Sequence, residues 1–301
     1  MRALVVDHAA PGRLALGTVA DPVPGPDEVL VRTTAISINY GELPTNTGAA
    51  EGVVPGWDAA GVVERSASGG RGPQPGDRVV TRGRSGGWAE LRAVHVDELA
   101  VLPDAVGFTT AAALPVAGVT ALQALRAVGV RPGLRVVVTG ASGGVGRFAV
   151  QLARLAGAEV YALVGSAARG EGLAALGADH VLTGAAEIEG PVDAVLDNVG
   201  GPLLSELLGH LAPEGVVASV GTASGQPTPI HPYQLVPNRL TLRGVKLGEG
   251  IGHDLAHLVQ LVADGRLDAS VDRVADWSEA GELATALVNR EVRGKAVLTL
   301  G

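Results

Sequence analysis

The residues best suited to chemistry lie in one glycine-rich segment, Val138-Thr-Gly-Ala-Ser-Gly-Gly-Val-Gly146. Gly140, Gly143 and Gly146 are three residues apart, between an apolar run and a helical pattern. Such spacing is typical of a dinucleotide-binding turn, because glycines allow a tight turn, let a pyrophosphate approach backbone amides, and pack the helix close to the strand. A helix N-terminus with a charge of about +0.5 and free N–H groups would favour a phosphate there.

The end of the next strand, expected at 159–164, indicates which dinucleotide is bound. An NAD site usually places Asp or Glu about 20 residues on, where it holds the ribose hydroxyls. Here the strand is followed by Gly165-Ser166-Ala-Ala-Arg169, which contains no acid. Arg169 and Ser166 can receive a 2′-phosphate, the arginine through a charge-assisted hydrogen bond. The alternative is that Arg169 is a solvated charge that opens a helix. The sequence favours NADPH.

The residues of the glycine turn also fit three other interpretations. Gly140-Ala-Ser142-Gly-Gly144 matches the nucleophile elbow of α/β-hydrolases, with Asp197 and His231 as possible partners, but an elbow does not require Gly146. Short-chain dehydrogenases have a similar turn, but none of the three tyrosines here forms their Tyr-x-x-x-Lys motif. The last alternative is a turn that binds nothing. It would pay the conformational entropy of ordering three glycines with no ligand bound in exchange.

The elements around this turn change character near residue 115. Before it, short apolar runs alternate with glycine and proline clusters, which predicts a compact β-domain. From about 118 the pattern of strand, glycine turn and helix repeats, which predicts an α/β fold with a doubly wound parallel sheet. We expect strands at 135–139, 159–164, 193–196, 215–220, 240–247 and 295–300, and helices at 143–156, 171–176, 203–211, 254–263 and 278–288.

Composition excludes several classes of protein. The chain is 47% hydrophobic, so it is globular, with one large domain or two ordinary ones. Its net charge of −8, without any basic run, argues against nucleic acid as a partner. It has no cysteine, which excludes disulfides, iron–sulfur clusters and thiolate-bound zinc. No stretch matches a signal peptide or a membrane span, so we expect a soluble, cytoplasmic protein.

Further motifs follow one another along nearly the whole chain: Ala35-Ile-Ser-Ile-Asn39, Gly56-Trp-Asp-Ala-Ala-Gly61, Pro75-Gly-Asp-Arg-Val79, Leu114-Pro-Val-Ala-Gly-Val-Thr-Ala-Leu122, Ala141-Ser-Gly-Gly-Val-Gly146, Asp197-Asn-Val-Gly200 and Gly294-Lys-Ala-Val-Leu298. In this order and spacing, the chain resembles the zinc-independent quinone oxidoreductases of the medium-chain dehydrogenase/reductase superfamily.

The resemblance implies a fold, a reaction and an assembly. Residues 1–117 would form a GroES-like domain, completed by 250–301, and residues 118–249 a Rossmann domain, with the active site in the cleft between the two. The expected reaction is hydride transfer from NADPH to a small-molecule quinone or an α,β-unsaturated carbonyl, without zinc. Relatives commonly pair through an edge strand of the Rossmann sheet, so 240–247 would lie near a homodimer interface.

The resemblance, the glycine turn and the end of the second strand together give the candidate site residues, and Tyr40 is included as the neighbour of Asn39 although it is not at the position of the family's tyrosine. Asn39 and Tyr40 are the catalytic candidates, because a developing oxyanion needs hydrogen-bond donors or an ordered water. Asn39 and Thr120 would lie near the nicotinamide. The remaining cofactor-binding residues fall in four groups: Ser142, Gly143, Gly144 and Val145; Gly165, Ser166 and Arg169; Asn198, Val220, Gly221 and Thr222; and Val245, Lys246 and Leu247 beside the nicotinamide.

Departures from the family patterns bear on metal and proton donor. Zinc-dependent relatives have a histidine where this chain has Trp57, so no metal is expected. Pro44 and Gly184 stand where quinone oxidoreductases often have tyrosines, one of them near the 2′-phosphate. This leaves the proton donor unnamed. Two other functions stay open: an enoyl reductase of one biosynthetic pathway and a non-catalytic NADPH-binding sensor.

Four polar residues have both a chemical and an ordinary interpretation. Glu42 and Asp58 could act as acids or bases, although Asp58 better fits a structural hydrogen-bond partner. His253 and His257 are four apart on an expected helix, but the apolar residues there define the opposite face, which places both histidines in solvent.

Overall fold

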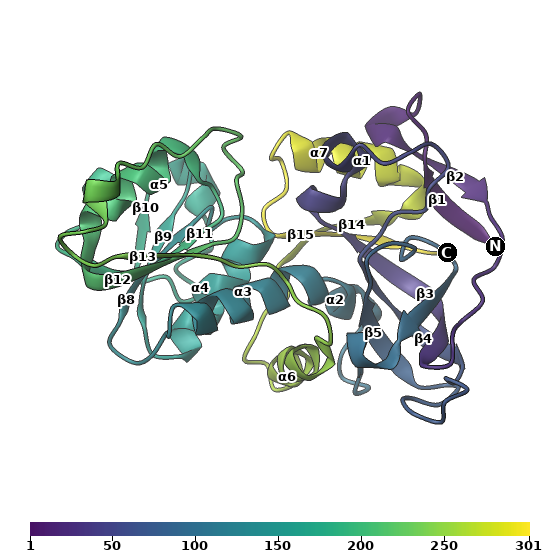
Figure 1. Ribbon diagram of the computed structural model, residues 1–301. Coiled ribbons are helices and arrows are strands. Elements are labelled where there is room, and N and C mark those ends of the chain that lie inside the picture. The colour runs from purple at the N-terminus through teal and green to yellow at the C-terminus, as the bar shows by residue number, and fades with distance from the viewer. The chain divides into compact units, whose positions relative to one another are not determined.

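The computed structural model describes residues 1–301, except for the side chains of Asn46 and Thr47. It divides the chain into two compact units (Figure 1). The first unit comprises Met1–Val119 and Gly248–Gly301, and the second comprises Thr120–Leu247. The second unit is therefore inserted between the two segments of the first.

The second unit contains a six-stranded sheet in which all neighbouring strands are parallel. The strand order is β10-β9-β8-β11-β12-β13, which is the doubly wound order of a Rossmann fold. The order reverses between β8 and β11. The strands are β8 (Arg135–Thr139), β9 (Glu159–Leu163), β10 (His180–Leu182), β11 (Val192–Asp197), β12 (Leu211–Ser219) and β13 (Thr241–Gly244).

Helices α4 (Gly144–Leu155) and α5 (Gly201–Leu207) cover opposite faces of this sheet (Figure 1). The strand residues between them are apolar without interruption, as in Val136–Val138, because both faces of a parallel sheet are buried. A further helix, α3 (Pro115–Ala127), begins in the first unit and ends in the second. The short 3₁₀ helix η4 (Ala167–Gly170) follows β9.

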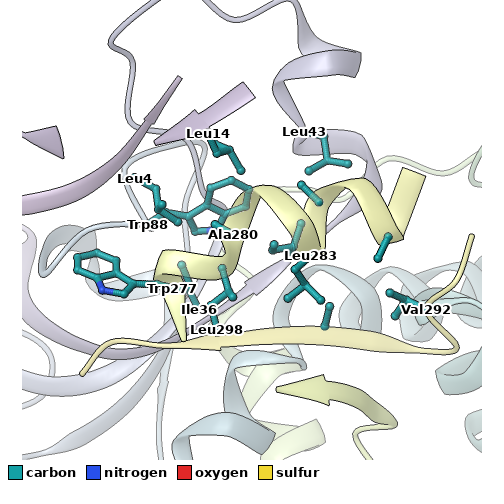
Figure 2. Close-up of a cluster of buried hydrophobic side chains, with 14 of the residues drawn as sticks. Leu4, Leu14, Ile36, Leu43, Trp88, Trp277, Ala280, Leu283, Val292 and Leu298 are labelled. Carbon is teal, nitrogen blue, oxygen red and sulfur yellow. The ribbon is translucent and has the colours of Figure 1, made fainter. Parts of the chain in front are cut away.

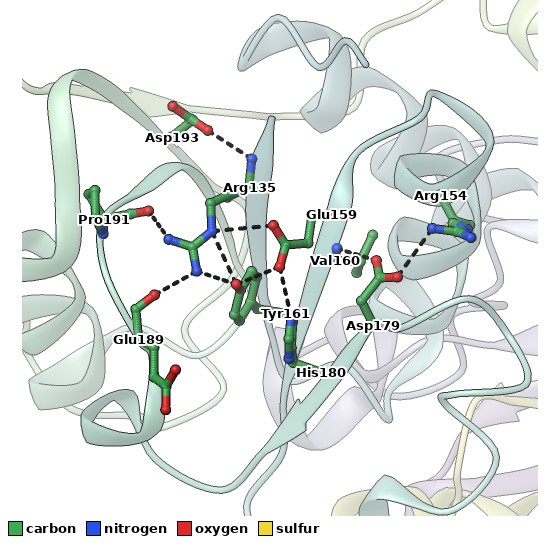
Figure 3. Close-up of polar contacts among 10 residues, drawn as sticks. All are labelled: Arg135, Arg154, Glu159, Val160, Tyr161, Asp179, His180, Glu189, Pro191 and Asp193. Atoms are coloured by element: carbon green, nitrogen blue, oxygen red, sulfur yellow. Dashed lines mark hydrogen bonds and ion pairs between the residues drawn. The ribbon is translucent and has the colours of Figure 1, made fainter. Parts of the chain in front are cut away.

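Polar residues connect the strands at the edge of the sheet where β8 and β9 begin (Figure 3). The Arg135 guanidinium donates to the Tyr161 hydroxyl, which donates to Glu159 Oε1 at 2.7 Å. Nε2 of His180 lies 2.7 Å from the same Glu159 oxygen, and its ring stacks on that of Tyr161. These charges have partners among themselves, so the cluster stabilises the sheet edge opposite the glycine turn.

The first unit contains a seven-stranded sheet and a two-stranded ladder. The path of the larger sheet is β14-β15-β3-β4-β5-β7, with β6 paired to β3. Only β14 and β15 are parallel to each other. The strands are β1 (Arg2–Val6), β2 (Leu14–Thr18), β3 (Glu28–Ile38), β4 (Asp58–Arg65), β5 (Arg78–Arg82), β6 (Leu91–His95), β7 (Leu99–Val101), β14 (Val271–Asp276) and β15 (Lys295–Thr299). The helices are α1 (Pro44–Thr47), α2 (Phe108–Ala112), α6 (Gly252–Ala263) and α7 (Ala280–Val288).

One apolar core in this unit joins the two ends of the chain (Figure 2). Leu4 and Ile36 come from the N-terminal part, and Leu283 and Leu298 come from the C-terminal part. Fully burying one such side chain contributes roughly 1.5–3 kcal/mol. The C-terminal segment is therefore part of the first unit's core and not an appendage.

The helix predicted at 171–176 is wrong. Residues 171–177 form turns instead, after the 3₁₀ helix η4. Gly172 has a φ of +79° and Gly177 a φ of +105°, which are left-handed conformations that interrupt a helix. The other expected helices and strands of the second unit are present, with shifted ends in most of them.

Candidate functional site

The glycine turn joins β8 to α4 in a conformation that depends on its glycines. Gly140 has a φ of +59°, and its carbonyl oxygen accepts a hydrogen bond from the Gly143 amide at 3.0 Å. A Cβ on Gly146 would lie 2.3 Å from that same oxygen and 2.6 Å from Ala141 Cα. Only glycine fits at 146, so the first turn of α4 packs directly against the end of the strand.

Hydrogen bonds tie the ends of β8 and β11 together at the point where the strand order reverses. Asp197 is fully buried, and its Oδ1 accepts from Thr139 Oγ1 at 2.7 Å. The Asn198 side chain donates from Nδ2 to the Thr139 carbonyl at 2.8 Å. This reversal at the carboxyl edge is where open α/β sheets bind their ligands.

Three more of the expected residues lie at the same edge. The amides of Val220 and Gly221 donate to the Asp197 carbonyl at 2.8 and 3.2 Å. A Cβ on Gly221 would lie 2.9 Å from the Asn198 carbonyl oxygen. Thr222 follows them and is exposed. The structure thus brings the predicted residues of β11 and β12 together with the glycine turn.

The end of β9 also reaches the glycine turn. Arg169, in η4, donates from Nε to Ser142 Oγ at 2.9 Å. Ser142 is buried, and Arg169 is half-buried. Gly165 and Ser166 are exposed at the start of the same segment. Two stretches that the sequence assigned separately to one cofactor, the turn and the end of the second strand, are therefore in contact.

The remaining predicted cofactor residues are less closely tied to this edge. Val245 follows β13, and its amide donates to the Ser219 carbonyl at 2.8 Å. Lys246 is exposed and Leu247 is half-buried. Thr120 is buried within α3. Their proximity to a nicotinamide stays a prediction.

In the first unit, Asn39 directly follows β3 and lies within a buried cluster of charged groups. Its Nδ2 donates to Glu42 Oε1 at 2.7 Å and to Asp58 Oδ2 at 2.8 Å, and its Oδ1 accepts from Lys295 Nζ at 2.6 Å. Both amide hydrogens are therefore engaged within the protein. Asn39 could donate to a reacting oxygen only if one of these bonds broke. Tyr40, the next residue, is 49% exposed.

Burial dominates the electrostatics of this cluster. Burial, aided by the Asp58 charge, raises the pKa of Glu42 to about 8, against the hydrogen bonds from Asn39 that lower it. Burial also raises the pKa of Asp58 and lowers the pKa of the Lys295 ammonium. Nζ of Lys295 is 3.7 Å from Asp58 Oδ2. Glu42 is thus the group that would exchange a proton near neutral pH.

Asp58 is a structural partner, as its ordinary interpretation held. Besides Asn39, it accepts a hydrogen bond on Oδ1 from the Val116 amide at 3.1 Å. The sequence analysis includes the motif Gly294-Lys-Ala-Val-Leu298 but gives Lys295 no functional role. The sequence does contain a signal for the buried cluster, because Lys295 stands in the mostly apolar run Lys295-Ala-Val-Leu-Thr-Leu300. A lysine buried with such a run needs a counter-charge.

Two alternative sites find no support in the geometry. Ser142 contacts Arg169, Asp197 contacts Thr139, and His231 accepts from the Tyr233 amide, so no hydrolase triad forms among these residues. His253 and His257 are exposed on α6, as expected. Within the described part of the chain, no three His, Asp or Glu residues could together hold a metal ion, and no helix is long and apolar enough to cross a membrane.

Comparisons with known proteins agree with this architecture. A family model of the GroES-like domain of alcohol dehydrogenases matches residues 25–104, and one of zinc-binding dehydrogenases matches residues 144–264. A GroES-like domain followed by a Rossmann domain defines a medium-chain dehydrogenase/reductase.

Individual relatives show which family of this superfamily the chain belongs to. A chloroplast envelope quinone oxidoreductase homolog of Arabidopsis thaliana is 32% identical, over 99% of this chain and 98% of that protein. The acrylyl-CoA reductase AcuI of Ruegeria pomeroyi is 31% identical, over 81% of this chain and 80% of that protein. A mycobacterial protein solved with NADPH has a TM-score of 0.88 and 26% identity, with 99% of each chain covered. This chain belongs to the zinc-independent quinone oxidoreductase family of that superfamily, and it is an oxidoreductase.

Proposed function

We propose that this chain uses NADPH to reduce a quinone or a C=C bond conjugated to a carbonyl, without zinc. The hydrogen bond between Arg169 and Ser142 carries the proposal, because it fixes a cation where the second strand of the fold ends and the phosphate-binding turn begins. In this fold that position faces the ribose of the adenosine half. An arginine there suits a 2′-phosphate, whereas an acid would suit free hydroxyls.

The residues present fit a dinucleotide. The close approach at Gly146 positions the N-terminus of α4, whose amides at Gly144 and Val145 would hold the diphosphate. A Cβ on Gly165 would meet no atom within 4 Å, so the end of β9 is open. Arg169 and Ser166 would hold the 2′-phosphate.

The residues do not fit a catalytic zinc ion, although one matching family model is named for zinc binding. The chain has no cysteine. Trp57 precedes Asp58, and that carboxylate is buried against Asn39 and Lys295. The donors that zinc prefers are thiolate, imidazole and carboxylate, and only the last is present here, already engaged.

When bound, NADPH supplies a hydride to the acceptor. The protein must then stabilise the negative charge that develops on the acceptor oxygen. Tyr40 is the proposed hydrogen-bond donor, because it directly follows Asn39 and its side chain is 49% exposed. Asn39 would act by positioning Tyr40 through the capping of the 3₁₀ helix η2 (Tyr40–Glu42).

Replacing Arg169 tests the cofactor assignment. Arg169→Ala should lose about 1.5–3 kcal/mol from a charged hydrogen bond, which is roughly a 10- to 150-fold weaker affinity for NADPH. The affinity for NADH, which lacks the 2′-phosphate, should barely change and serves as the control. Isothermal titration calorimetry on the purified protein measures both. An equal loss for the two coenzymes would overturn the assignment.

An acceptor screen tests the reaction itself. Purified protein should oxidise NADPH with simple quinones or enones, and failure with all of them despite tight NADPH binding would favour the non-catalytic sensor. The similarity to an acrylyl-CoA reductase favours enoyl thioesters as a second candidate class. Higher kcat/KM for an enoyl thioester than for 1,4-benzoquinone would select that candidate.

We also propose a homodimer that acts in the cytoplasm. Strand β13 ends the sheet, and all four of its residues are exposed, as an edge strand available for pairing would be. Sedimentation equilibrium would test the pairing.

A further inference from the structure

Arg147 lies in the first turn of α4, three residues after the helix begins at Gly144. Its amide donates to the Gly143 carbonyl at 3.0 Å. Within the part of the chain that the structure describes, its Nε is buried and has no hydrogen-bond partner. Arg154 and Arg239 of this unit each contact a carboxylate, that of Asp179 and that of Glu214. Arg147 is the cation near the glycine turn that lacks a counter-charge.

The Arg147 side chain extends toward the segment after β9. A Cβ on Gly172 would lie 3.3 Å from Arg147 Nη2, so the guanidinium lies against this residue. Gly172 is three residues after Arg169, whose own guanidinium reaches Ser142 beside the start of α4. Both arginines therefore connect the start of α4 to the segment after β9. Arg147 extends from the helix to Gly172, and Arg169 extends from the segment to Ser142.

Arg147 is half-buried, and its buried Nε donates to no acceptor in the protein. Burying an unpaired polar group costs free energy, which an acceptor oxygen of a ligand would recover. A phosphate monoester carries about −1.5 to −2 charges at neutral pH and has three acceptor oxygens, so it can engage two guanidinium groups. The diphosphate is a poorer match, because it binds the amides at the tip of the helix, while Arg147 lies inside the first turn and extends toward the ribose side.

We propose that Arg147 is a second determinant of NADPH specificity, which binds the 2′-phosphate together with Arg169. The inference rests on the proposed function and names a further residue for it.

The test compares Arg147→Met with Arg154→Met. Both remove one positive charge from α4, but Arg154 has its own partner in Asp179. Titration calorimetry with NADPH, NADH and 2′,5′-ADP measures the three affinities. Arg147→Met should bind NADPH and 2′,5′-ADP roughly 10-fold more weakly and NADH within about twofold of the unaltered protein. Arg154→Met should leave all three affinities unchanged.

A second variant guards against misfolding. Arg147→Lys keeps the charge without the planar fork, so it should lose only about three- to fivefold in NADPH affinity. Equal weakening of NADH and NADPH by Arg147→Met, or no weakening of either, would overturn the inference. If the unaltered protein binds neither NADPH nor 2′,5′-ADP, the proposed function itself fails, which is a different result.

Discussion

Gly146→Ala tests the close contact on which the glycine turn depends. The new Cβ would lie 2.3 Å from the Gly140 carbonyl oxygen and 2.6 Å from Ala141 Cα, whereas ordinary contacts begin at 3.4 Å. Both neighbours are backbone, so no side chain can move aside, and α4 must shift from β8 by about 1 Å. Overpacking of this kind costs roughly 1–3 kcal/mol, and a contact between two backbones belongs at the upper end of that range.

The consequence for binding follows from the same shift. Amides that should converge on a diphosphate would be displaced, so we expect the affinity for NADPH to fall at least about 10-fold. Urea denaturation measures the free energy of unfolding, and calorimetry measures binding.

Gly143→Ala is the matched control for stability. Its Cβ would meet only the Gly140 oxygen, at 3.4 Å, and its φ of −84° suits any residue. Because alanine is a poorer N-cap than glycine, we expect its free energy of unfolding to fall by only about 0.5–1 kcal/mol, well below the loss in Gly146→Ala. The reasoning is refuted if Gly146→Ala is as stable as Gly143→Ala and binds NADPH like the unaltered protein.

Two further predictions concern the buried cluster of the first unit. Because burial raises the pKa of Glu42 from 4.5 to about 8, the folded protein binds more protons than the unfolded chain between these values. The free energy of unfolding should therefore decrease as the pH rises through this window, by roughly 1–3 kcal/mol more than in Glu42→Gln. Urea denaturation at several pH values measures this difference. Parallel curves of unfolding free energy against pH for the two proteins would contradict the prediction. Lys295→Met removes one partner of a buried ion pair and should destabilise by about 3–5 kcal/mol, whereas Lys246→Met, at an exposed position, should change stability by less than about 0.5 kcal/mol; similar unfolding curves for the two lysine variants would argue against the ion pair.

The sequence predicts the second unit well because its signals are local. The apolar run before Gly140 and the spacing of the three glycines determine strand, turn and helix within a dozen residues. The sequence alone assigns both Ser142 and Arg169 to the cofactor, and the structure joins them by a hydrogen bond. The failure at 171–176 is also local, because left-handed glycines interrupt an apolar pattern that would otherwise suit a helix.

Contacts between distant parts of the chain could not be predicted in this way. Lys295 meets Asn39 across 256 positions, and no periodicity connects them. The role proposed for Arg147 could not be predicted either, because it depends on Gly172, which lies in a segment that the sequence predicts to be helical. The engagement of Asn39, which changes its expected chemistry, is likewise visible only in three dimensions.

The position of β15 in the sheet has a consequence for synthesis on the ribosome. This strand lies between β14 and β3, and it is translated after the whole inserted unit. The inserted unit has all its strands as soon as residue 247 has left the exit tunnel, whereas β3 must wait for its partner β15 at residues 295–299. During that interval Asp58 and Glu42 have no ammonium beside them. We therefore expect the nascent chain to mature from its middle outward, and premature termination before residue 295 to leave a half that chaperones must protect.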